Sequence, residues 1–330
     1  MNQKVTGCKR KWQSHDNSKE ENFMQEKNNE MNGAMSLEGF LYCIRHDVAK
    51  VLGKNFDVTL HQVTKNNGLK LDGLTIKEIS TNIAPTIYLN TFYRKYVNGM
   101  ELEAIVENII STYEAHKVEQ DFDVKWFLNW ETVKEHIIFK LVNYEKNLQM
   151  LQEVPYVKYL DLAIIFQVSV DSVDEGIATI TIKDEHMSLW EKTTDDLMEV
   201  AKVNTPVMFE SQIRNIMDIM MGLTSEMPYC FERDEELLPM FVLSNQQNVN
   251  GAATILYPGV LKSFADAKET DLFVIPSSTH EVILVPADGR MDMDSISEMV
   301  VAVNGTEVAP DEVLSDHCYF YCREDDELRF

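Results

Sequence analysis

The most apolar segment of the chain is Leu160-Asp161-Leu162-Ala163-Ile164-Ile165-Phe166-Gln167-Val168-Ser169-Val170. Apolar side chains occupy both alternating faces of this segment, which is typical of a strand covered on two sides. Asp174-Glu175-Gly176 is expected to form a turn, and Ala178, Ile180 and Ile182 alternate with polar residues on a predicted returning strand. The pattern predicts the central strand of a sheet, extended by a hairpin.

Both helices and strands are predicted on the N-terminal side of this hairpin. A helix is expected behind an N-cap at Ser36, and Gly53 ends it. The turn Lys65-Asn66-Asn67-Gly68 joins two alternating strands into a hairpin. The predicted elements are, in order, a helix over 37–52, strands over 56–60, 69–76 and 86–89, and a helix over 102–113.

The C-terminal side is predicted to continue with mixed helices and strands. A capping box from Ser295 to Glu298 opens the last helix, and Asn304-Gly305 ends it. The other predicted elements are a helix from Thr194, a helix carrying Ile213, Ile216, Met217, Met220 and Met221, strands over 238–243, 252–257, 272–275 and 282–285, a helix after Pro258-Gly259, and a strand over 318–322.

These elements predict an α+β fold with mixed sheets, packed helices and two lobes. The chain has 330 residues, of which 45% are hydrophobic, so a sizeable core can form. Residues 1–33 contain almost no aliphatic side chains and are expected to form a disordered tail. We expect an N-terminal α+β lobe over 34–154 and a C-terminal α/β lobe with a mixed sheet over 155–330.

The tail supplies a first testable prediction. Deleting residues 1–33 is expected to leave the thermal midpoint of unfolding almost unchanged, because a segment so polar buries little surface. The midpoint is measured by circular dichroism on the full chain and on the truncated chain. A fall of several degrees would show that the tail packs on the body.

Composition and charge argue against a nucleic-acid-binding, a membrane-embedded or a secreted protein. Lys and Arg number 30 against 54 Asp and Glu, for a net charge of −24, so the surface repels nucleic-acid phosphates and direct nucleic-acid binding is not expected. No apolar run is long enough for a membrane helix, and the N-terminus lacks the apolar segment of a signal peptide. Five cysteines form an odd set, Cys8, Cys43, Cys230, Cys318 and Cys322, which favours reduced thiols in a cytoplasm.

Six segments together resemble a known family. The first is Asn66-Asn67-Gly68-Leu69-Lys70-Leu71-Asp72-Gly73-Leu74, and the others are 82–89, 140–147, 256–261, 276–286 and 307–316. They resemble the family catalogued as domain of unknown function 5688 over about Ser36 to Arg323. The resemblance implies a cytoplasmic protein of bacteria, typically gram-positive anaerobes, and it carries no established activity.

One turn offers candidate catalytic residues. Ser277-Ser278-Thr279-His280-Glu281 places hydroxyls, an imidazole and a carboxylate between two apolar strands. The candidates are His280, Glu281, Ser277 and Ser278, with His280 expected to be partly accessible and Glu281 held by a backbone donor or a basic residue. No Gly-x-Ser-x-Gly elbow occurs, and a hydroxyl-rich turn that caps strand ends explains the same residues.

No cofactor or metal is predicted. The sequence has no His-Glu-x-x-His, no paired Cys-x-x-Cys and no glycine-rich phosphate loop. Asp288, Asp292, Asp294 and Glu298 lack the register of a calcium loop and are interpreted as helix N-terminal acids.

Two classes of function stay open on these grounds. The favoured one is a cytoplasmic, non-catalytic interaction or regulatory protein with a protein partner. The alternative is a hydrolase-like enzyme centred on Ser277–Glu281.

Overall fold

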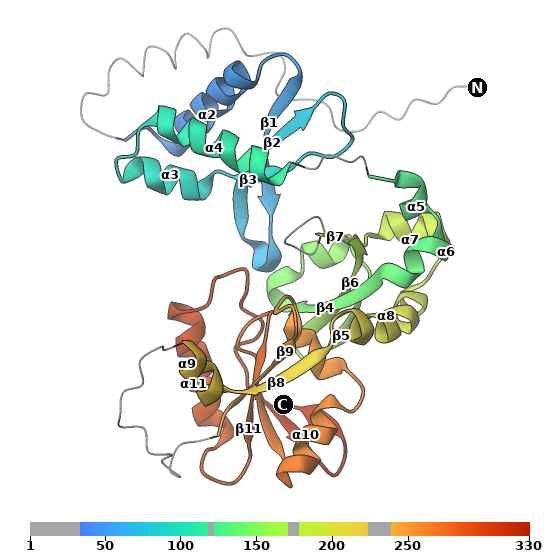
Figure 1. Ribbon diagram of the computed structural model, residues 1–330. Coiled ribbons are helices and arrows are strands. Elements are labelled where there is room, and N and C mark those ends of the chain that lie inside the picture. Colours follow the sequence, from blue (N-terminus) through green and yellow to red (C-terminus); the bar gives the residue numbers. More distant parts are fainter. Residues whose placement is uncertain (1–33, 118–121, 171–177, 224–238) are drawn as a thin grey trace. The chain divides into compact units, whose positions relative to one another are not determined.

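The computed structural model describes residues 34–117, 122–170, 178–223 and 239–330 (Figure 1). The predicted tail over 1–33 and the turn at 174–176 lie outside these residues. Contacts divide the chain into two compact units. Unit 1 comprises Met1–Val63 and Leu71–Phe122, and unit 2 comprises Thr64–Lys70 and Asp123–Phe330.

The division differs from the predicted lobes, which met between residues 154 and 155. Residues 123–154 belong to unit 2 because they contain β4 (Ile137–Asn143), which pairs along its whole length with β6 (Leu162–Val170). A strand cannot be separated from its hydrogen-bonded neighbour, so the boundary falls near residue 122.

Unit 1 packs three helices on a three-stranded sheet. Its elements are α2 (Leu37–Leu52), β1 (Phe56–Thr64), β2 (Lys70–Glu78), β3 (Thr86–Tyr88), α3 (Asn90–Val97) and α4 (Leu102–His116), with strand order β1-β2-β3. The Ser36 hydroxyl caps α2 by accepting from the Gly39 N–H at 3.2 Å. Gly53 follows the helix with a φ of 79°, which a glycine adopts without strain. The apolar stripe of α2, with Phe40, Ile44 and Val48, is fully buried.

The first sheet of unit 2 has β6 at its centre. β4 pairs with one edge of β6, and β5 (Tyr156–Tyr159) and β7 (Ala178–Thr181) share its other edge, all antiparallel. Every residue from Leu162 to Ser169 is buried, which confirms the predicted central strand. Leu160, with a φ of 55°, turns the chain from β5 into β6.

The second sheet of unit 2 has six strands in the order β13-β12-β10-β11-β9-β8. They are β8 (Ser211–Asn215), β9 (Phe241–Asn245), β10 (Leu272–Ile275), β11 (Val282–Pro286), β12 (Tyr319–Cys322) and β13 (Glu327–Arg329). Neighbouring strands in both sheets of unit 2 run antiparallel rather than forming the expected mixed sheet. Short turns, such as those between β10 and β11 and between β12 and β13, allow only antiparallel neighbours.

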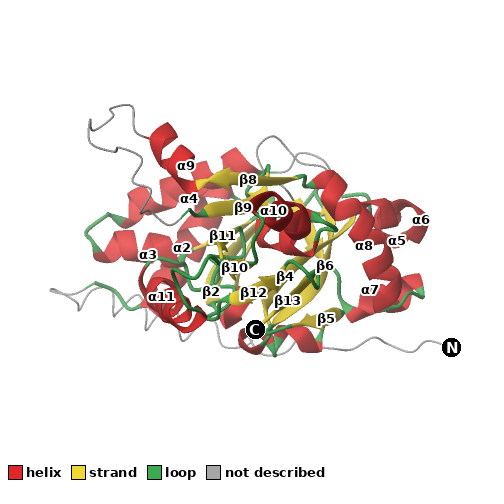
Figure 2. Ribbon diagram, turned by 90° about the horizontal axis from the view of Figure 1, so that it is seen from below, coloured by secondary structure: helices red, strands yellow, loops and turns green. Residues whose placement is uncertain are grey.

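Helices cover both faces of this second sheet. α11 (Met293–Thr306) packs Ile296 and Val300 against Phe273 and Val285 on one face. α10 (Val260–Lys268) packs Phe264 on Phe241, whose side chain points to the other face, and Figure 2 shows α10 lying across the strands. The remaining helices of unit 2 are α5 (Val124–Leu128), α6 (Trp130–Val133), α7 (Asp184–Trp190), α8 (Thr194–Met208) and α9 (Ile216–Leu223).

Three predicted elements take another form. Ile213 lies in β8 rather than in a helix, because Ser211–Asn215 pairs with β9, and α9 begins only at Ile216. The predicted strand over 252–257 is the 3₁₀ segment η5 (Gly251–Leu256), since Asn250 turns the chain with a φ of 53°. Asp292, not Ser295, caps α11, and this helix runs past the predicted stop at 304–305.

Candidate functional site

The Ser277–Glu281 turn joins β10 to β11 in unit 2 and is held by its own backbone. The Ser278 N–H donates to the Glu281 carbonyl at 3.1 Å, and the His280 N–H donates to the Ser278 hydroxyl at 3.0 Å. Thr279 is buried, and its N–H donates to the Glu312 carbonyl at 2.8 Å. A hydrogen bond between a serine hydroxyl and the backbone two residues further on stabilises a turn. The turn is therefore closed by local bonds and fastened to the segment before β12.

Both ring nitrogens of His280 have partners. Nδ1 accepts from the Asn250 N–H at 3.1 Å, so the neutral ring carries its proton on Nε2. Nε2 faces Oε1 of Glu312 at 3.5 Å. The His280 side chain is 35% exposed, which agrees with the partial accessibility expected from the sequence. The ring is an acceptor for backbone on one side and a partner of a carboxylate on the other.

The other candidates do not complete a catalytic group. Neither serine hydroxyl bonds to the His280 ring, and the Ser278 hydroxyl instead accepts from the backbone. The Glu281 carboxylate forms no hydrogen bond or ion pair with any residue that the structure describes, whereas a backbone donor or basic residue was expected. A nucleophile–base pair requires the base nitrogen to face the nucleophile. The turn brings His280 to Glu312, which sequence spacing alone did not indicate.

Gly251 packs directly behind this turn. A Cβ on Gly251 would lie 2.1 Å from the Ser244 Oγ, 2.4 Å from the His280 carbonyl oxygen and 2.8 Å from the Asn245 nitrogen. The Ser244 hydroxyl itself donates to the His280 carbonyl at 2.8 Å. The end of β9, the start of η5 and the His280 turn thus meet at a point where only glycine fits.

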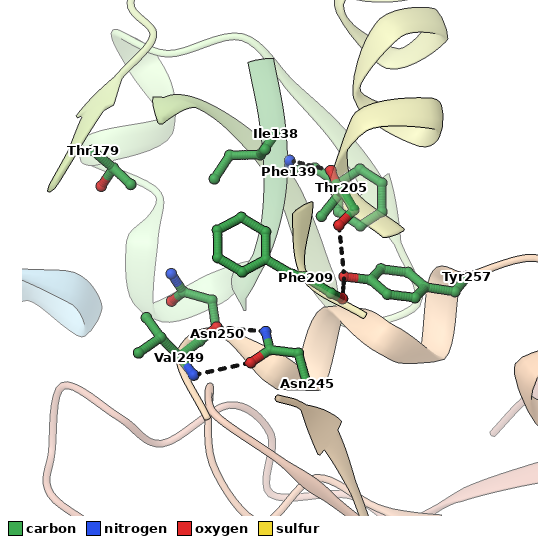
Figure 3. A pocket seen from close by; sticks show the side chains of 9 residues that line it. All are labelled: Ile138, Phe139, Thr179, Thr205, Phe209, Asn245, Val249, Asn250 and Tyr257. Atoms are coloured by element: carbon green, nitrogen blue, oxygen red, sulfur yellow. Dashed lines mark hydrogen bonds between the residues drawn. The ribbon is translucent and has the colours of Figure 1, made fainter. Parts of the chain in front are cut away.

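A small hollow lies beside the loop that follows β9 (Figure 3). Its volume of about 10 Å³ is the room that one water molecule needs. Its lining residues are Ile138, Phe139, Thr179, Thr205, Phe209, Asn245, Val249, Asn250 and Tyr257. The Tyr257 hydroxyl donates to the Phe209 carbonyl at 3.0 Å, and burial raises the pKa of Tyr257. This hollow is too small for a metabolite, and the hydroxyl on its wall stays protonated.

The comparison with family models agrees with the resemblance. The model of a family described as "Family of unknown function (DUF5688)" matches residues 37–323. The chain belongs to this family. No curated protein and no solved structure gives a match.

Three of the segments that carry the DUF5688 resemblance meet in unit 2, at the turn that contains the 3₁₀ segment η1 (Asn66–Gly68). The Asn67 side chain donates to the carbonyls of Pro310 at 2.9 Å and Val313 at 2.7 Å. The side chains of Asn67 and Asn147 bond to each other at 2.9 Å, and the Asn67 N–H donates to Asn147 Oδ1 at 2.8 Å. Asn143 donates to the Leu314 carbonyl at 3.0 Å. The asparagines thus tie three chain segments together by bonding to backbone groups.

A half-buried acid, Asp161, extends this set of hydrogen bonds through Ser315. Asp161, in the turn before β6, accepts from the Ser315 hydroxyl at 2.6 Å and from the Tyr319 hydroxyl at 2.5 Å. Ser315 and Tyr319 are fully buried. Burial first, and the neighbouring Asp161 charge second, raise the pKa of Tyr319, so this phenol remains a hydrogen-bond donor. The sequence offered no signal for this contact, because its partners are more than 150 residues apart.

Neither the Cys318 thiol nor a cluster of metal-binding side chains forms a second site among the described residues. Burial raises the pKa of the Cys318 thiol to about 12, so Cys318 is protonated and unreactive near neutral pH. In the described ranges, no group of three or more His, Cys, Asp or Glu side chains could hold a metal ion. Asp292 caps α11 and Asp288 pairs with Arg290 at 2.6 Å. Nor does any helix in those ranges combine the length and apolarity needed to cross a bilayer.

Proposed function

We propose that this protein is a non-catalytic interaction protein of the cytoplasm. The observation that carries the proposal is the His280 ring, whose two nitrogens are taken by the Asn250 N–H and the Glu312 carboxylate. A general base needs one nitrogen within reach of the proton it removes. Neither serine of the turn bonds to the ring, so the geometry favours a structural turn over the hydrolase alternative.

The partner we propose is a protein with a basic surface. The chain carries a net charge of −24, and opposite potentials steer two proteins together and fix their orientation. The hollow near β9 holds about one water molecule, which leaves no room there for a small-molecule substrate. A cytoplasmic location is supported by Cys318, which is a buried thiol and not part of a disulfide.

The test of the proposed function compares two neighbouring variants. His280→Ala is expected to lower the free energy of unfolding by about 1–3 kcal/mol, because it leaves the Asn250 N–H without its acceptor. The matched change Glu281→Ala is expected to change it by less than about 0.5 kcal/mol, since this carboxylate has no partner among the described residues. Urea denaturation gives both values.

The same variants separate binding from hydrolysis. The wild-type chain is assayed on a panel of ester and peptide substrates, and its partner is captured from the native cell and identified by mass spectrometry. We expect no hydrolysis, and we expect binding of the purified partner to weaken as salt is raised. Hydrolysis that His280→Ala abolishes and Glu281→Ala preserves would refute the proposal.

A further inference from the structure

The strand β1 forms a long, regular edge of the sheet in unit 1. It has nine residues and is the longest edge strand in the three sheets that the structure describes. Backbone bonds to the β2 side close both of its ends. The Lys65 N–H donates to the Leu69 carbonyl at 2.7 Å, and the Ile79 N–H donates to the Asn55 carbonyl at 3.0 Å. Both bonds fit one continuous register, which leaves no bulge along β1.

Alternate residues of β1 direct their backbone groups away from β2. Because Asn55 and Lys65 bond to the β2 side, the odd-numbered residues of the strand face β2 and the even-numbered ones face outward. Val58, Leu60 and Gln62 are thus outward-facing, and their N–H and carbonyl groups form no hydrogen bond with any residue that the structure describes. Gln62 is an exposed residue, so this part of the edge lies at the surface.

The next-longest edge strand, β4 of unit 2, is protected by contrast. The Phe139 N–H donates to the Thr205 hydroxyl at 3.1 Å, and the Ile137 carbonyl accepts from the Asn204 amide at 3.0 Å. Both side chains come from α8, which packs along β4. Proteins normally cover such edges or block them with proline or lysine, because a free edge pairs with another strand. Phe56–Thr64 contains neither proline nor lysine.

We propose that β1 pairs with β1 of a second copy of this chain, antiparallel about a two-fold axis at Leu60. This pairing places Leu60 opposite Leu60 of the second copy and Val58 opposite Gln62 of the second copy. It forms about six hydrogen bonds, two for each of three residue pairs. The two sheets become one continuous sheet in the order β3-β2-β1-β1-β2-β3.

The side chains that meet across this pair are compatible. Thr59 lies opposite His61 of the second copy, and both are exposed residues. Asp57, the only acidic residue of β1, lies opposite Val63 of the second copy. No charge therefore meets its like across the pair, and the same surface serves both copies, as a two-fold dimer requires.

The charge of this edge favours a second copy over the basic partner proposed above. β1 carries a single acid, although the whole chain has a net charge of −24. A basic protein would find little opposite potential at this strand, whereas two acidic copies can meet here with little local repulsion. The dimer thus goes beyond the proposed function and is independent of it.

Sedimentation equilibrium of the full chain tests the dimer. We expect a concentration-dependent monomer–dimer equilibrium that strengthens several-fold as salt is raised, because salt screens the repulsion between two copies that each carry −24. The basic partner should instead bind more weakly at high salt, so the two associations can be told apart. A monomer at every concentration and salt, or a dimer that weakens with salt, would overturn the proposal.

A proline at the edge tests the backbone bonds. Gln62→Pro removes an outward N–H and leaves the bonds from β1 to β2 in place, and edge strands tolerate proline. We expect it to weaken the dimer at least tenfold, since the bond is lost on both sides of the two-fold axis. Gln62→Val is the control, because it retains the N–H and should dimerise as the wild type does. Circular dichroism checks that both variants are folded, and equal dimerisation of the two would count against the pairing.

Two charge variants test the register without proline. One carries Thr59→Glu with His61→Glu, and the other carries Thr59→Lys with His61→Lys. In the proposed register these two positions lie opposite each other, so either variant alone brings like charges together and should be monomeric. An equimolar mixture brings opposite charges together and should restore the dimer. Dimers of either variant alone, or a mixture that stays monomeric, would show that β1 does not pair in this way.

Discussion

Gly251→Ala is expected to lower the free energy of unfolding by about 3 kcal/mol or more, at the upper end of the cost of overpacking a core. The added Cβ would meet two backbone atoms, the His280 carbonyl oxygen at 2.4 Å and the Asn245 nitrogen at 2.8 Å. Backbone atoms cannot rotate away as a side chain can. The end of β9 or the His280 turn must therefore move, and the bond from the Asn250 N–H to His280 is strained with it.

Tryptophan fluorescence during urea denaturation provides the measurement. Trp126, Trp130 and Trp190 all lie in unit 2, as Gly251 does, so the signal reports on the unit that is perturbed. The control is Gly305→Ala in α11, where an added Cβ meets no atom within 4 Å, and we expect it to stabilise the helix by up to about 1 kcal/mol. A loss below about 1 kcal/mol for Gly251→Ala would contradict the packing described for this turn.

Phe166→Ala is expected to cost about 3–5 kcal/mol, the range for removing an aromatic ring from a core. Phe166 is fully buried at the centre of β6 and lies opposite Phe139 of β4. Its carbonyl also accepts from the Ile182 N–H at 3.0 Å, so the strand is fixed on both edges and cannot collapse into the space left by the ring. The cavity therefore remains.

The same fluorescence measurement tests this change against a phenylalanine at the surface. Phe330 is 56% exposed at the end of the chain, although its ring touches Tyr319 and His317. Phe330→Ala should cost less than about 1 kcal/mol, because most of its ring already lies in water. Equal costs for the two substitutions would show that β6 is not the centre of the core.

Local signals in the sequence were sufficient for much of the fold. The Ser36 cap and Gly53 predicted both ends of α2, because a capping hydroxyl and a left-handed glycine act on the nearest turn of helix. The two apolar faces of Leu162–Val170 predicted a central strand, since burial on both sides leaves no polar face. The α+β class followed from such elements.

Pairing between distant segments could not be predicted in this way. β4 is a short apolar run broken by Lys140, and periodicity does not distinguish such a run from a helix. Ile213 fits a helical stripe in the sequence, but β9 recruits its segment as an edge strand. In both cases the partner strand supplies hydrogen bonds that outweigh local preference.

The candidate site also combines features that the sequence predicted with contacts that only the tertiary structure determined. The sequence placed hydroxyls, an imidazole and a carboxylate in one turn, and the turn forms where it was predicted, between β10 and β11. Only the tertiary structure decided that the His280 ring meets the Asn250 N–H and the Glu312 carboxylate. Cap, turn and strand preferences act over a few residues and can be inferred from neighbours in sequence. The partners of the His280 ring lie about 30 residues away in the sequence, and they come close only when the strands have paired.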